Sequence, residues 1–447
     1  MSSAVGLKAA FHAQQPGTPD LLALHELDPA RYPFLLQSVA GHPVSGRYDL
    51  LFAFPQWDSP ETVREGPDFF ARLSQTVASV GALPDDALPF VGGWFVFLGY
   101  EAARFIEPRL TLPASPYALP DAIAVRCPAA LIVDRELGVT HLLAESDPAQ
   151  LQRMLADLAR IGAMPQPAAT RVLNVEEEPA QRYLEGCQRV LDYLVAGDTF
   201  QINLSRRWRA RLAADAKPTA LYRSLRDSNP APFSGLAQFA QGAVISSSPE
   251  RLISIDQDRV ETRPIAGTRP RGLSDAEDAA FKSQLVGSLK ERAEHVMLID
   301  LERNDLGRVC VPGSVEVSEL MTVESYAHVH HIVSNVRGRL RPEVGVGEAI
   351  AAVFPGGTIT GCPKLRAMEI IAELEGVGRG PYTGAMGYIS RHGKADLNIL
   401  IRSLVVQDDT VSFRAGAGIV ADSVPELELT ETRTKARGLL RALSVAG

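Results

Sequence analysis

The sequence has few cysteines and no long apolar run. Its 447 residues include four cysteines, none of them in a Cys-x-x-Cys pair. This excludes a disulfide framework and a zinc cluster built on thiolates, so we expect reduced thiols. One of the longest strongly apolar stretches, Val91–Tyr100, is about half of the ~20 residues that a membrane helix needs. We therefore expect no membrane span.

The sequence also lacks a strong excess or a long run of basic residues. Lysine plus arginine number 45 against 53 acidic residues, which gives a net charge of −8, and no run of five basic residues occurs. These features argue against nucleic acid and anionic membranes as partners. Residues 1–18 lack the basic region and apolar core of a secretory signal, so we expect a cytoplasmic location. Small molecules and other proteins are the expected partners.

What the sequence does have is apolar content for a large core, 46%. The Ala/Pro-rich stretch Gly162–Thr170 (GAMPQPAAT) predicts a connection between an N-terminal region, residues 1–165, and a catalytic region, residues 170–447.

Periodicity predicts both helices and strands. Helices are expected at 147–161, 181–196 and from Ser274 toward 304, where the segment SDAE is typical of a capping box. β-Branched content predicts strands at 48–54, 92–97, 242–255, 384–390, 396–406 and 410–420. Because no regular βαβ rhythm connects these elements, the mixture favours an α+β fold.

Two pairs of glutamates share one spacing. Glu291 and Glu294 lie in one predicted helix, and Glu428 and Glu431 lie in another near the C-terminus. Residues i and i+3 share a helix face, so each pair aims two carboxylates in one direction. If the helices converge, these oxygens suit Mg²⁺, which binds through one or two carboxylates together with substrate oxygens. The spacing alone favours the alternative, two solvated faces paired with nearby basic residues: Lys290, Arg292, Arg433 and Lys435.

Two glycine-rich segments between these helices can receive an anion. Residues 354–364 (FPGGTITGCPK) place glycines, threonines and a lysine just before a predicted helix at 365–375. They do not form a Walker loop, because no Gly-Lys-Ser/Thr is present. In residues 414–419 (RAGAGI), Gly416 and Gly418 allow a ligand close to the backbone. Together with a metal site, these segments indicate a small polycarboxylate or phosphate substrate.

Three longer motifs carry a family resemblance. They are residues 264–272 (PIAGTRPRG), 291–308 (ERAEHVMLIDLERNDLGR) and 414–426 (RAGAGIVADSVPE). Through them the chain resembles the chorismate-utilising enzymes over most of residues 175–440. That family includes anthranilate synthase large subunits, aminodeoxychorismate synthase component I, and the isochorismate and salicylate synthases. The resemblance implies large antiparallel sheets flanked by helices around a Mg²⁺-dependent chorismate site.

The resemblance makes metal ligation the better interpretation of the four glutamates. Glu294 and Glu431 match the Mg²⁺ ligands of the family, and Glu291 and Glu428 match groups that support them. The metal would neutralise the ring carboxylate of chorismate. Loss of the C4 hydroxyl also needs a proton, and Glu250 matches the family's general acid.

Further residues match groups around the substrate. His331 matches a histidine beside the reacting ring, with a core histidine as the alternative. The resemblance implies carboxylate contacts for Thr358, Tyr388, Arg402, Lys435 and the backbone of Gly416, Ala417 and Gly418.

The residue at position 266, Ala266, helps to distinguish between the branches of the family. Water-adding members carry a lysine at this position as base, and many aminodeoxychorismate synthases carry a lysine that attacks C2. Alanine can do neither, so ammonia is the expected nucleophile. Segments 35–39, 42–49, 201–204, 330–334 and 354–364 look more like aminodeoxychorismate synthase. We therefore expect amination of chorismate to 4-amino-4-deoxychorismate, toward 4-aminobenzoate and folate. The alternative, favoured by Ala266, is anthranilate synthesis with release of pyruvate.

The ammonia source and a regulatory site follow from the same resemblance. No Gly-x-Cys-x-Gly motif of a glutaminase occurs, so we expect a separate glutamine amidotransferase subunit. Both amino-transferring branches bind tryptophan in an N-terminal pocket, for which a loop packed between sheets is the alternative. The matching residues are Ser38, Val44, Ser45, Gly46, Arg47, Tyr48, Pro232, Phe233 and Ser234. A hypothesis of another class is a silent regulatory subunit that binds chorismate or tryptophan, against which the intact glutamates and Glu250 argue.

Overall fold

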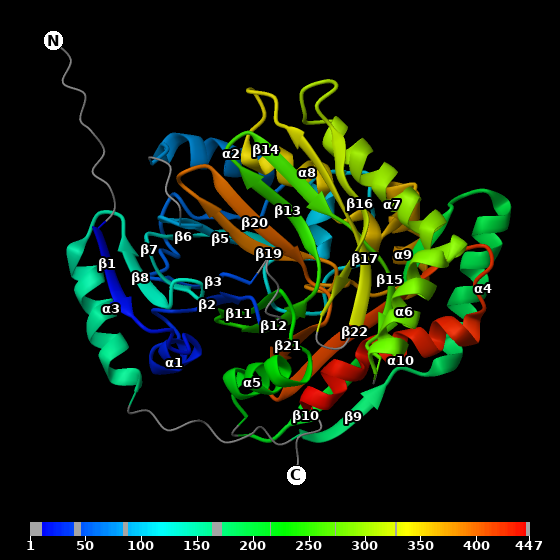
Figure 1. Ribbon diagram of the computed structural model, residues 1–447, viewed down its shortest axis with the longest axis horizontal. Helices are drawn as coiled ribbons and strands as arrows, with labels where there is room; N and C mark the ends of the chain where they lie inside the picture. The colour runs from blue at the N-terminus through cyan, green and yellow to red at the C-terminus, as the bar shows by residue number, and fades with distance from the viewer. Residues whose placement is uncertain are drawn as a thin grey trace.

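The computed structural model describes residues 11–39, 46–83, 88–162, 172–214, 216–272, 274–326 and 329–443. Two large antiparallel sheets lie at its centre, and helices cover their outer faces (Figure 1). This confirms the predicted α+β class with large antiparallel sheets flanked by helices.

The first sheet has 12 strands in the described residues. Their order is β1 (Phe11–Pro16), β8 (Val139–Ala144), β7 (Ala129–Asp134), β3 (Tyr48–Ala53), β2 (Phe34–Gln37), β11 (Phe233–Phe239), β12 (Gly242–Ser248), β21 (Ser403–Gln407), β22 (Thr410–Ile419), β10 (Gln201–Leu212) and β18 (Gly361–Cys362), with β9 (Val172–Glu177) paired to β10.

The second sheet has 10 strands in the same residues. Their order is β15 (Ile265–Pro270), β17 (Val329–Arg339), β14 (Arg259–Arg263), β13 (Arg251–Asp256), β20 (Lys394–Ile399), β19 (Ala385–Ser390), β5 (Gly93–Leu98), β6 (Ala122–Cys127) and β4 (Val63–Arg64), with β16 (Glu316–Ser325) paired to β17.

The helices lie outside these sheets (Figure 1). They are α1 (Leu22–Leu27), α2 (Phe69–Val80), α3 (Pro148–Ile161), α4 (Ala180–Ala196), α5 (Pro218–Ser228), α6 (Asp275–Gly287), α7 (Leu289–Gly307), α8 (Val346–Val353), α9 (Lys364–Glu375) and α10 (Pro425–Leu443), with short 3₁₀ helices η1 (Tyr100–Phe105) and η2 (Gly357–Ile359). None of the described helices has the length and apolar content that crossing a bilayer requires.

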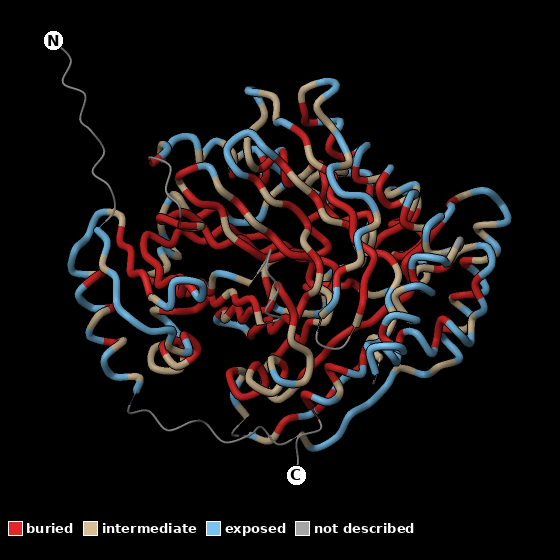
Figure 2. Tube along the Cα trace, in the orientation of Figure 1, coloured by how far each residue is buried: buried red, intermediate tan, exposed pale blue. Residues whose placement is uncertain are grey.

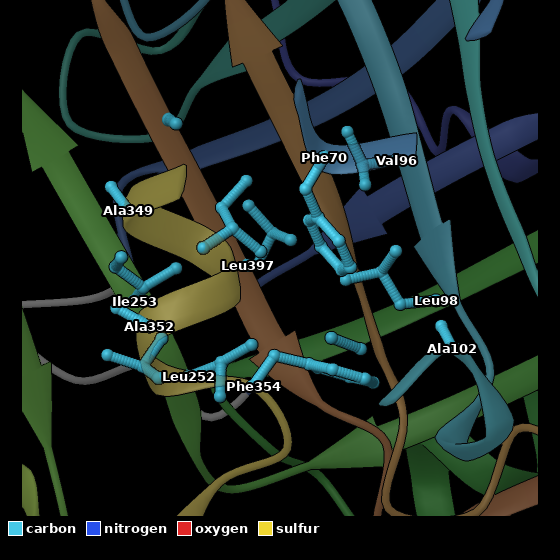
Figure 3. Packing of buried hydrophobic residues seen from close by; sticks show 14 of the residues in the cluster. Phe70, Val96, Leu98, Ala102, Leu252, Ile253, Ala349, Ala352, Phe354 and Leu397 are labelled. Carbon is cyan, nitrogen blue, oxygen red and sulfur yellow. The ribbon is translucent and has the colours of Figure 1, made fainter. Parts of the chain in front are cut away.

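The two sheets bury an apolar core between them. The rings of Phe34 in β2 and Phe95 in β5 stack across this core, with centroids 3.9 Å apart. On the outer faces, α2 and α8 cover the second sheet, and α1, α3 and α5 cover the first (Figure 3 shows the packing beneath α8). The strands are mostly buried and the outer sides of the helices exposed (Figure 2). Apolar burial of this extent is the main favourable term in folding.

Helices form where the apolar spacing and the caps predict them. The Ser274 hydroxyl accepts the backbone N–H of Glu277, which confirms the capping box, and α4 ends at Gly197 in a left-handed conformation. The single helix expected from Ser274 toward 304 is two helices, α6 and α7. They separate because Ser288 is extended and its hydroxyl caps α7 by accepting the N–H of Glu291.

The chain passes between the sheets at two points that the sequence prediction missed. β12 of the first sheet continues into β13 of the second, and β20 of the second continues into β21 of the first. The prediction of single strands at 242–255 and 396–406 is therefore wrong, because each segment forms two strands, interrupted at 249–250 and at 400–402. Ile399 N–H donates to the Glu250 carbonyl at 3.0 Å, which joins the two crossovers. As a result, Glu250 and Arg402 lie together where the sheets meet.

The predicted boundary near 162–170 falls almost wholly outside the described residues. Both sheets combine strands from residues 1–165 with strands from 170–447, because β2 pairs with β11 and β5 pairs with β19. The division into an N-terminal and a catalytic region stays a prediction about the sequence, and the two regions share their core.

Candidate active site

Two paired strands form the floor of the candidate site. β10 and β22 are antiparallel, with Asn203 opposite Gly418. On one face, Ile202 and Ile419 join an apolar cluster with α4 and α9. Because side chains alternate along a strand, Gln201, Asn203 and the two glycines of β22 belong to the opposite face.

Glu294 reaches this floor from α7. Its Oε1 accepts a hydrogen bond from Gln201 Nε2 at 3.0 Å. A Cβ atom on Gly418 would lie 2.3 Å from that same nitrogen and 3.5 Å from Glu294 Oε1. Glycine at 418 is therefore what allows Gln201 and Glu294 to meet over the strand.

Helix α10 approaches the same strand from the other side. Lys435 Nζ donates to the Gly416 carbonyl at 3.1 Å and lies 2.7 Å from a Glu431 carboxylate oxygen. Glu428 is buried, and its Oε1 accepts a hydrogen bond from the Ser423 hydroxyl at 2.7 Å. Helices α7 and α10 thus both reach the segment Gly416–Gly418, through Glu294 and Lys435, and a metal site shared by their glutamates stays a prediction.

The two sheet crossovers add an acid and a cation. Glu250 is buried, and burial raises its pKa to about 7, although the Thr358 hydroxyl, Lys435 and Arg402 partly counteract this. Arg402 lies within electrostatic reach of Glu431 as well as Glu250. Within the described part of the chain, Glu250 Oε1 is buried without a hydrogen-bond partner. Glu250 is therefore a carboxyl group that can carry a proton near neutral pH beside two cations.

His331 and Ala266 lie on neighbouring strands of the second sheet. Ala266 in β15 is opposite Ile332 in β17, next to His331, and Ala266 is buried. His331 Nδ1 lies 3.0 Å from the Thr268 hydroxyl, and burial lowers the pKa of His331 to about 4. His331 is therefore neutral at physiological pH.

Glu291 lies at the edge of this group. Its Oε1 accepts a hydrogen bond from Arg269 Nη1 at 3.1 Å, and a Cβ atom on Gly267 would be 2.8 Å from its Oε2. Of the basic partners named in the solvated-face alternative, Lys435 does pair with Glu431, whereas Glu291 pairs with Arg269 of β15. The roles of the four glutamates as metal ligands stay a prediction.

Tyr388 does not lie where the resemblance predicts. Its ring packs against Phe52 and Phe90 in the core between the sheets, with centroids 6.3 and 6.0 Å away. The tyrosine at the site is Tyr382, whose hydroxyl would lie 2.9 Å from a Cβ atom on Gly416. The physical reason is the strand: residue 388 lies within β19, whereas Tyr382 lies in the turn before it.

Sequence reasoning also missed Gln201 and Asn203 as site residues. Asn203 Nδ2 lies 3.4 Å from the Thr358 carbonyl, and its buried Oδ1 has no partner among the described residues. Their polar side chains alternate with Ile202 and Leu204, and this period of two was a usable signal for one polar face. Ala417, by contrast, points its methyl group into the apolar cluster with α4, and only its backbone can serve the site.

The glutamate carboxylates are compatible with Mg²⁺, but they do not by themselves surround a cation. Among the described residues, no three acidic, histidine or cysteine side chains converge on one point. Glu294 and Glu431 nevertheless offer oxygen ligands on both sides of Gly416–Gly418. Mg²⁺ commonly takes one or two carboxylates and completes its shell with water and substrate oxygens. The residues present fit that pattern.

The predicted tryptophan pocket is only partly within the described residues. Val44 and Ser45 lie outside them. The structure brings Ser38 next to the segment that contains Pro232, Phe233 and Ser234, because β2 pairs with β11. Gly46, Arg47 and Tyr48 lead into β3, where Arg47 forms an ion pair with Asp134 at 2.8 Å. Tryptophan binding stays a prediction.

None of the four cysteines is activated as a nucleophile. All are free thiols, and burial raises the pKa of each one, to about 12 for Cys127 and Cys187. The thiolate is the nucleophilic form, so these thiols are poor nucleophiles.

Comparison with known proteins assigns the family. Residues 56–441 match the family described as chorismate binding enzyme. The chain belongs to the chorismate-binding enzyme family. An anthranilate synthase component I-like protein from Synechocystis is 40% identical over 410 residues, which cover 90% of this chain and 84% of that protein. Anthranilate synthase component 1 from Thermus thermophilus is 42% identical over 368 residues, which cover 81% of this chain and 79% of that one.

Solved structures of chorismate-binding enzymes share the fold. The crystal structure of anthranilate synthase component I from Streptococcus pneumoniae aligns with a TM-score of 0.79 at 30% identity and covers 89% of this chain and 93% of that one. A menaquinone-specific isochorismate synthase from Escherichia coli aligns with a TM-score of 0.76 at 18% identity, covering 97% and 95%. The latter likeness concerns the fold alone.

The comparisons overturn the expected branch. Amination to 4-amino-4-deoxychorismate is wrong as the leading interpretation, because relatives at 36–42% identity are named anthranilate synthase component 1. Segments 201–204, 330–334 and 354–364, which suggested the other branch, form β10, β17 and the η2 loop. They build the scaffold around the site and so discriminate poorly. Ala266, which brings no amine, favours the anthranilate branch as the sequence indicated.

Proposed function

We propose that this enzyme makes anthranilate: it joins ammonia to chorismate and releases water and pyruvate. The observation that best supports this is the meeting of Glu250, Arg402, Lys435 and Glu294 around Gly416–Gly418, in a chain whose relatives are named anthranilate synthase component 1.

The cations account for substrate binding. Chorismate carries two carboxylates, and two cations, Arg402 and Lys435, interact electrostatically with Glu250, with Lys435 also bonded to the Gly416 carbonyl. An arginine guanidinium can bind a carboxylate through two parallel hydrogen bonds, whereas lysine acts as a point charge. We assign the pyruvyl-ether carboxylate to Arg402 and propose that the Gly416 and Gly418 backbone lets the ring approach closely.

Mg²⁺ is assigned to the two glutamate helices. Glu294 and Glu431 would hold it, with Glu291 and Glu428 as supporting groups. When bound, it would supply charge neutralisation for the ring carboxylate, which makes the ring more electrophilic.

Glu250 supplies the proton for the leaving group. Nitrogen forms a bond to ring C2, the two double bonds shift, and the C4–oxygen bond breaks. The departing hydroxyl takes the Glu250 proton and leaves as water. Neutral His331 then accepts the ring proton at C2, and the C3–oxygen bond breaks with its electron pair leaving on oxygen as the enolate of pyruvate, which takes up one proton at its methylene carbon. This step releases pyruvate and gives the aromatic product.

Ammonia comes from a second subunit in this proposal. The relatives' names include the words component 1, and the four thiols of this chain are not activated for glutamine hydrolysis. We propose a separate glutamine amidotransferase subunit, which free ammonia replaces in vitro.

The test is product analysis with the purified protein, chorismate, Mg²⁺ and ammonium. We expect equimolar anthranilate and pyruvate, identified by fluorescence and mass. Accumulation of a 4-amino product without pyruvate would overturn the proposal. Glu294→Gln should lose most turnover, whereas equal turnover of this variant and wild type would reject the metal assignment. Binding of chorismate without turnover would favour a regulatory subunit.

A further inference from the structure

A buried arginine lies directly behind the site. Arg379, in the turn between α9 and β19, is 1% exposed. Its Nη2 donates to the Asn203 carbonyl at 2.7 Å, and its Nη1 donates to the Ile359 carbonyl at 3.1 Å and to the Thr383 hydroxyl at 3.3 Å. Each acceptor belongs to a different segment of the chain.

Those three segments carry site residues. Asn203 presents its side chain to Gly416, Ile359 follows Thr358 in η2, and Thr383 follows Tyr382. The guanidinium joins the distant Asn203 strand and the η2 segment to its own turn, which contains Thr383. One planar group therefore sets the spacing of three polar side chains around the glycine segment.

Arg379 is itself held on every side. Glu375, one helical turn earlier, accepts from its Nη2 at 2.7 Å and from its Nε at 3.0 Å. The Glu101 carboxylate, from η1, accepts the backbone N–H of Arg379 at 2.6 Å. The guanidinium also lies over the rings of Tyr100 and Tyr382, 5.0 and 5.5 Å from their centroids. Glu101 and Tyr100, which belong to the N-terminal region, thus help to hold Arg379 in place behind the site.

We propose that Arg379 is a positioning residue of the active site, which fixes Asn203, Thr358 and Tyr382 relative to one another without touching the substrate. The use of activity as a readout rests on the proposed function. Lysine cannot replace this role, because a single ammonium cannot span acceptors on three segments with the fixed geometry of a guanidinium fork.

Arg414 offers a matched control. It is also buried, 4% exposed, and its Nη2 lies 2.5 Å from Glu375 Oε2, the oxygen that also accepts from Arg379 Nε. Its Nε donates to the Ser205 hydroxyl at 3.0 Å, and no hydrogen bond from it to the Ile359 or Thr383 segments occurs within the described residues. Removing either arginine leaves Glu375 with one cation, so both variants keep a neutral buried pair.

The experiment compares Arg379→Gln with Arg414→Gln, using chorismate as substrate. Loss of folded protein lowers the apparent kcat but leaves the KM of the remaining folded enzyme unchanged, whereas displaced contacts change KM. We expect Arg379→Gln to raise the KM for chorismate at least about fivefold and to lower kcat/KM at least about tenfold more than Arg414→Gln, whose KM stays within about twofold of wild type.

Equal KM values for Arg379→Gln and wild type, or equal effects of the two variants, would overturn the proposal. If Arg379→Gln does not fold, Arg379→Lys and Arg414→Lys replace the pair with the same expected outcomes. The dissociation constant for chorismate, measured by calorimetry, separates this proposal from the proposed reaction. If wild type binds chorismate but makes no anthranilate, the proposed function fails, and the dissociation constants of the two variants still test Arg379.

Discussion

At the scale of single residues, the proposed role of buried Glu250 as proton donor predicts how turnover depends on pH. Burial raises the pKa of this carboxyl to about 7, so its proton is lost as the pH rises through neutrality. An enzyme that needs this proton loses activity there. At a fixed concentration of free ammonia, we expect kcat to fall about tenfold per pH unit above about pH 7.

Glu250→Gln removes the ionisation and the proton together. We expect kcat to drop about 10²–10³-fold and the remaining rate to lose its alkaline limb. Initial rates of anthranilate formation across the pH range measure both effects. If Glu250→Gln still loses activity above pH 7 as wild type does, another group causes that pH dependence. If the variant has wild-type turnover, Glu250 is not part of the mechanism.

A second residue-scale prediction separates the two tyrosines. The Tyr382 hydroxyl faces Gly416, whereas the ring of Tyr388 packs between Phe52 and Phe90. We therefore expect Tyr382→Phe to raise the KM for chorismate about fivefold and Tyr388→Phe to leave it within about twofold of wild type. Steady-state kinetics of the two variants side by side provide the measurement. The reverse order would restore Tyr388 to the site.

At the scale of elements, the glycines of β22 are the sharpest constraint. A Cβ atom on Gly416 would meet Asn203 Oδ1 at 2.6 Å, the Leu204 carbonyl at 2.7 Å and the Tyr382 hydroxyl at 2.9 Å. The backbone oxygen cannot move aside as a flexible side chain can. We expect Gly416→Ala to lower kcat/KM about 10²-fold, because the strand must shift and with it the carbonyl that holds Lys435.

Gly307→Ala is the matched control for Gly416→Ala. Gly307 ends α7, and a Cβ atom there would meet nothing within 4 Å. The activity and the thermal unfolding of Gly307→Ala should match those of wild type. If both alanine variants lose activity equally, the effect is not specific to the close approach at β22.

Element positions were largely predictable, but breaks within elements were not. The carboxylate spacing and the Ser274 capping box predicted helical structure where α6, α7 and α10 lie, because helix periodicity is a local property, although α6 and α7 were expected as one helix. The crossovers at Glu250 and Arg402 interrupt apolar runs that look like continuous strands. Pro249 was a usable signal for the first. Arg402 takes a left-handed φ of 53°, which arginine rarely adopts and which its sequence does not reveal.

At the scale of the whole molecule, the two regions defined by sequence share both sheets and the support of the site. Glu101 and Tyr100, near the middle of the N-terminal region, contact Arg379 behind the catalytic strands. Long-range contacts of this kind have no local pattern in the sequence, which is why Arg379 escaped prediction. The metal-binding roles that the family motifs gave the glutamates stay a prediction, and the tyrosine at the site lies in the turn before β19 rather than within it.

The same buried carboxyls make the stability of the whole molecule depend on pH. Burial raises the pKa of Glu302 to about 8 and the pKa values of Glu101 and Glu250 to about 7. The folded state therefore binds more protons than the unfolded state, whose glutamates ionise near their ordinary pKa. The free energy of unfolding contributed by these groups falls as the pH rises toward and through their folded pKa values. The two histidines whose pKa burial lowers to about 4, His295 and His331, are neutral in the folded state throughout the interval from pH 7 to 8.

We expect the free energy of unfolding to decrease by about 1 kcal/mol or more over that interval, measured by denaturant titration at each pH. Glu302→Gln should reduce the slope, because glutamine carries no proton to lose. Glu136→Gln is the control, since that side chain is 69% exposed. A Glu302→Gln variant with the wild-type slope would show that Glu302 ionises normally in the folded protein. A free energy of unfolding that rises over this interval would contradict the raised pKa values of all three carboxyls, Glu250 included.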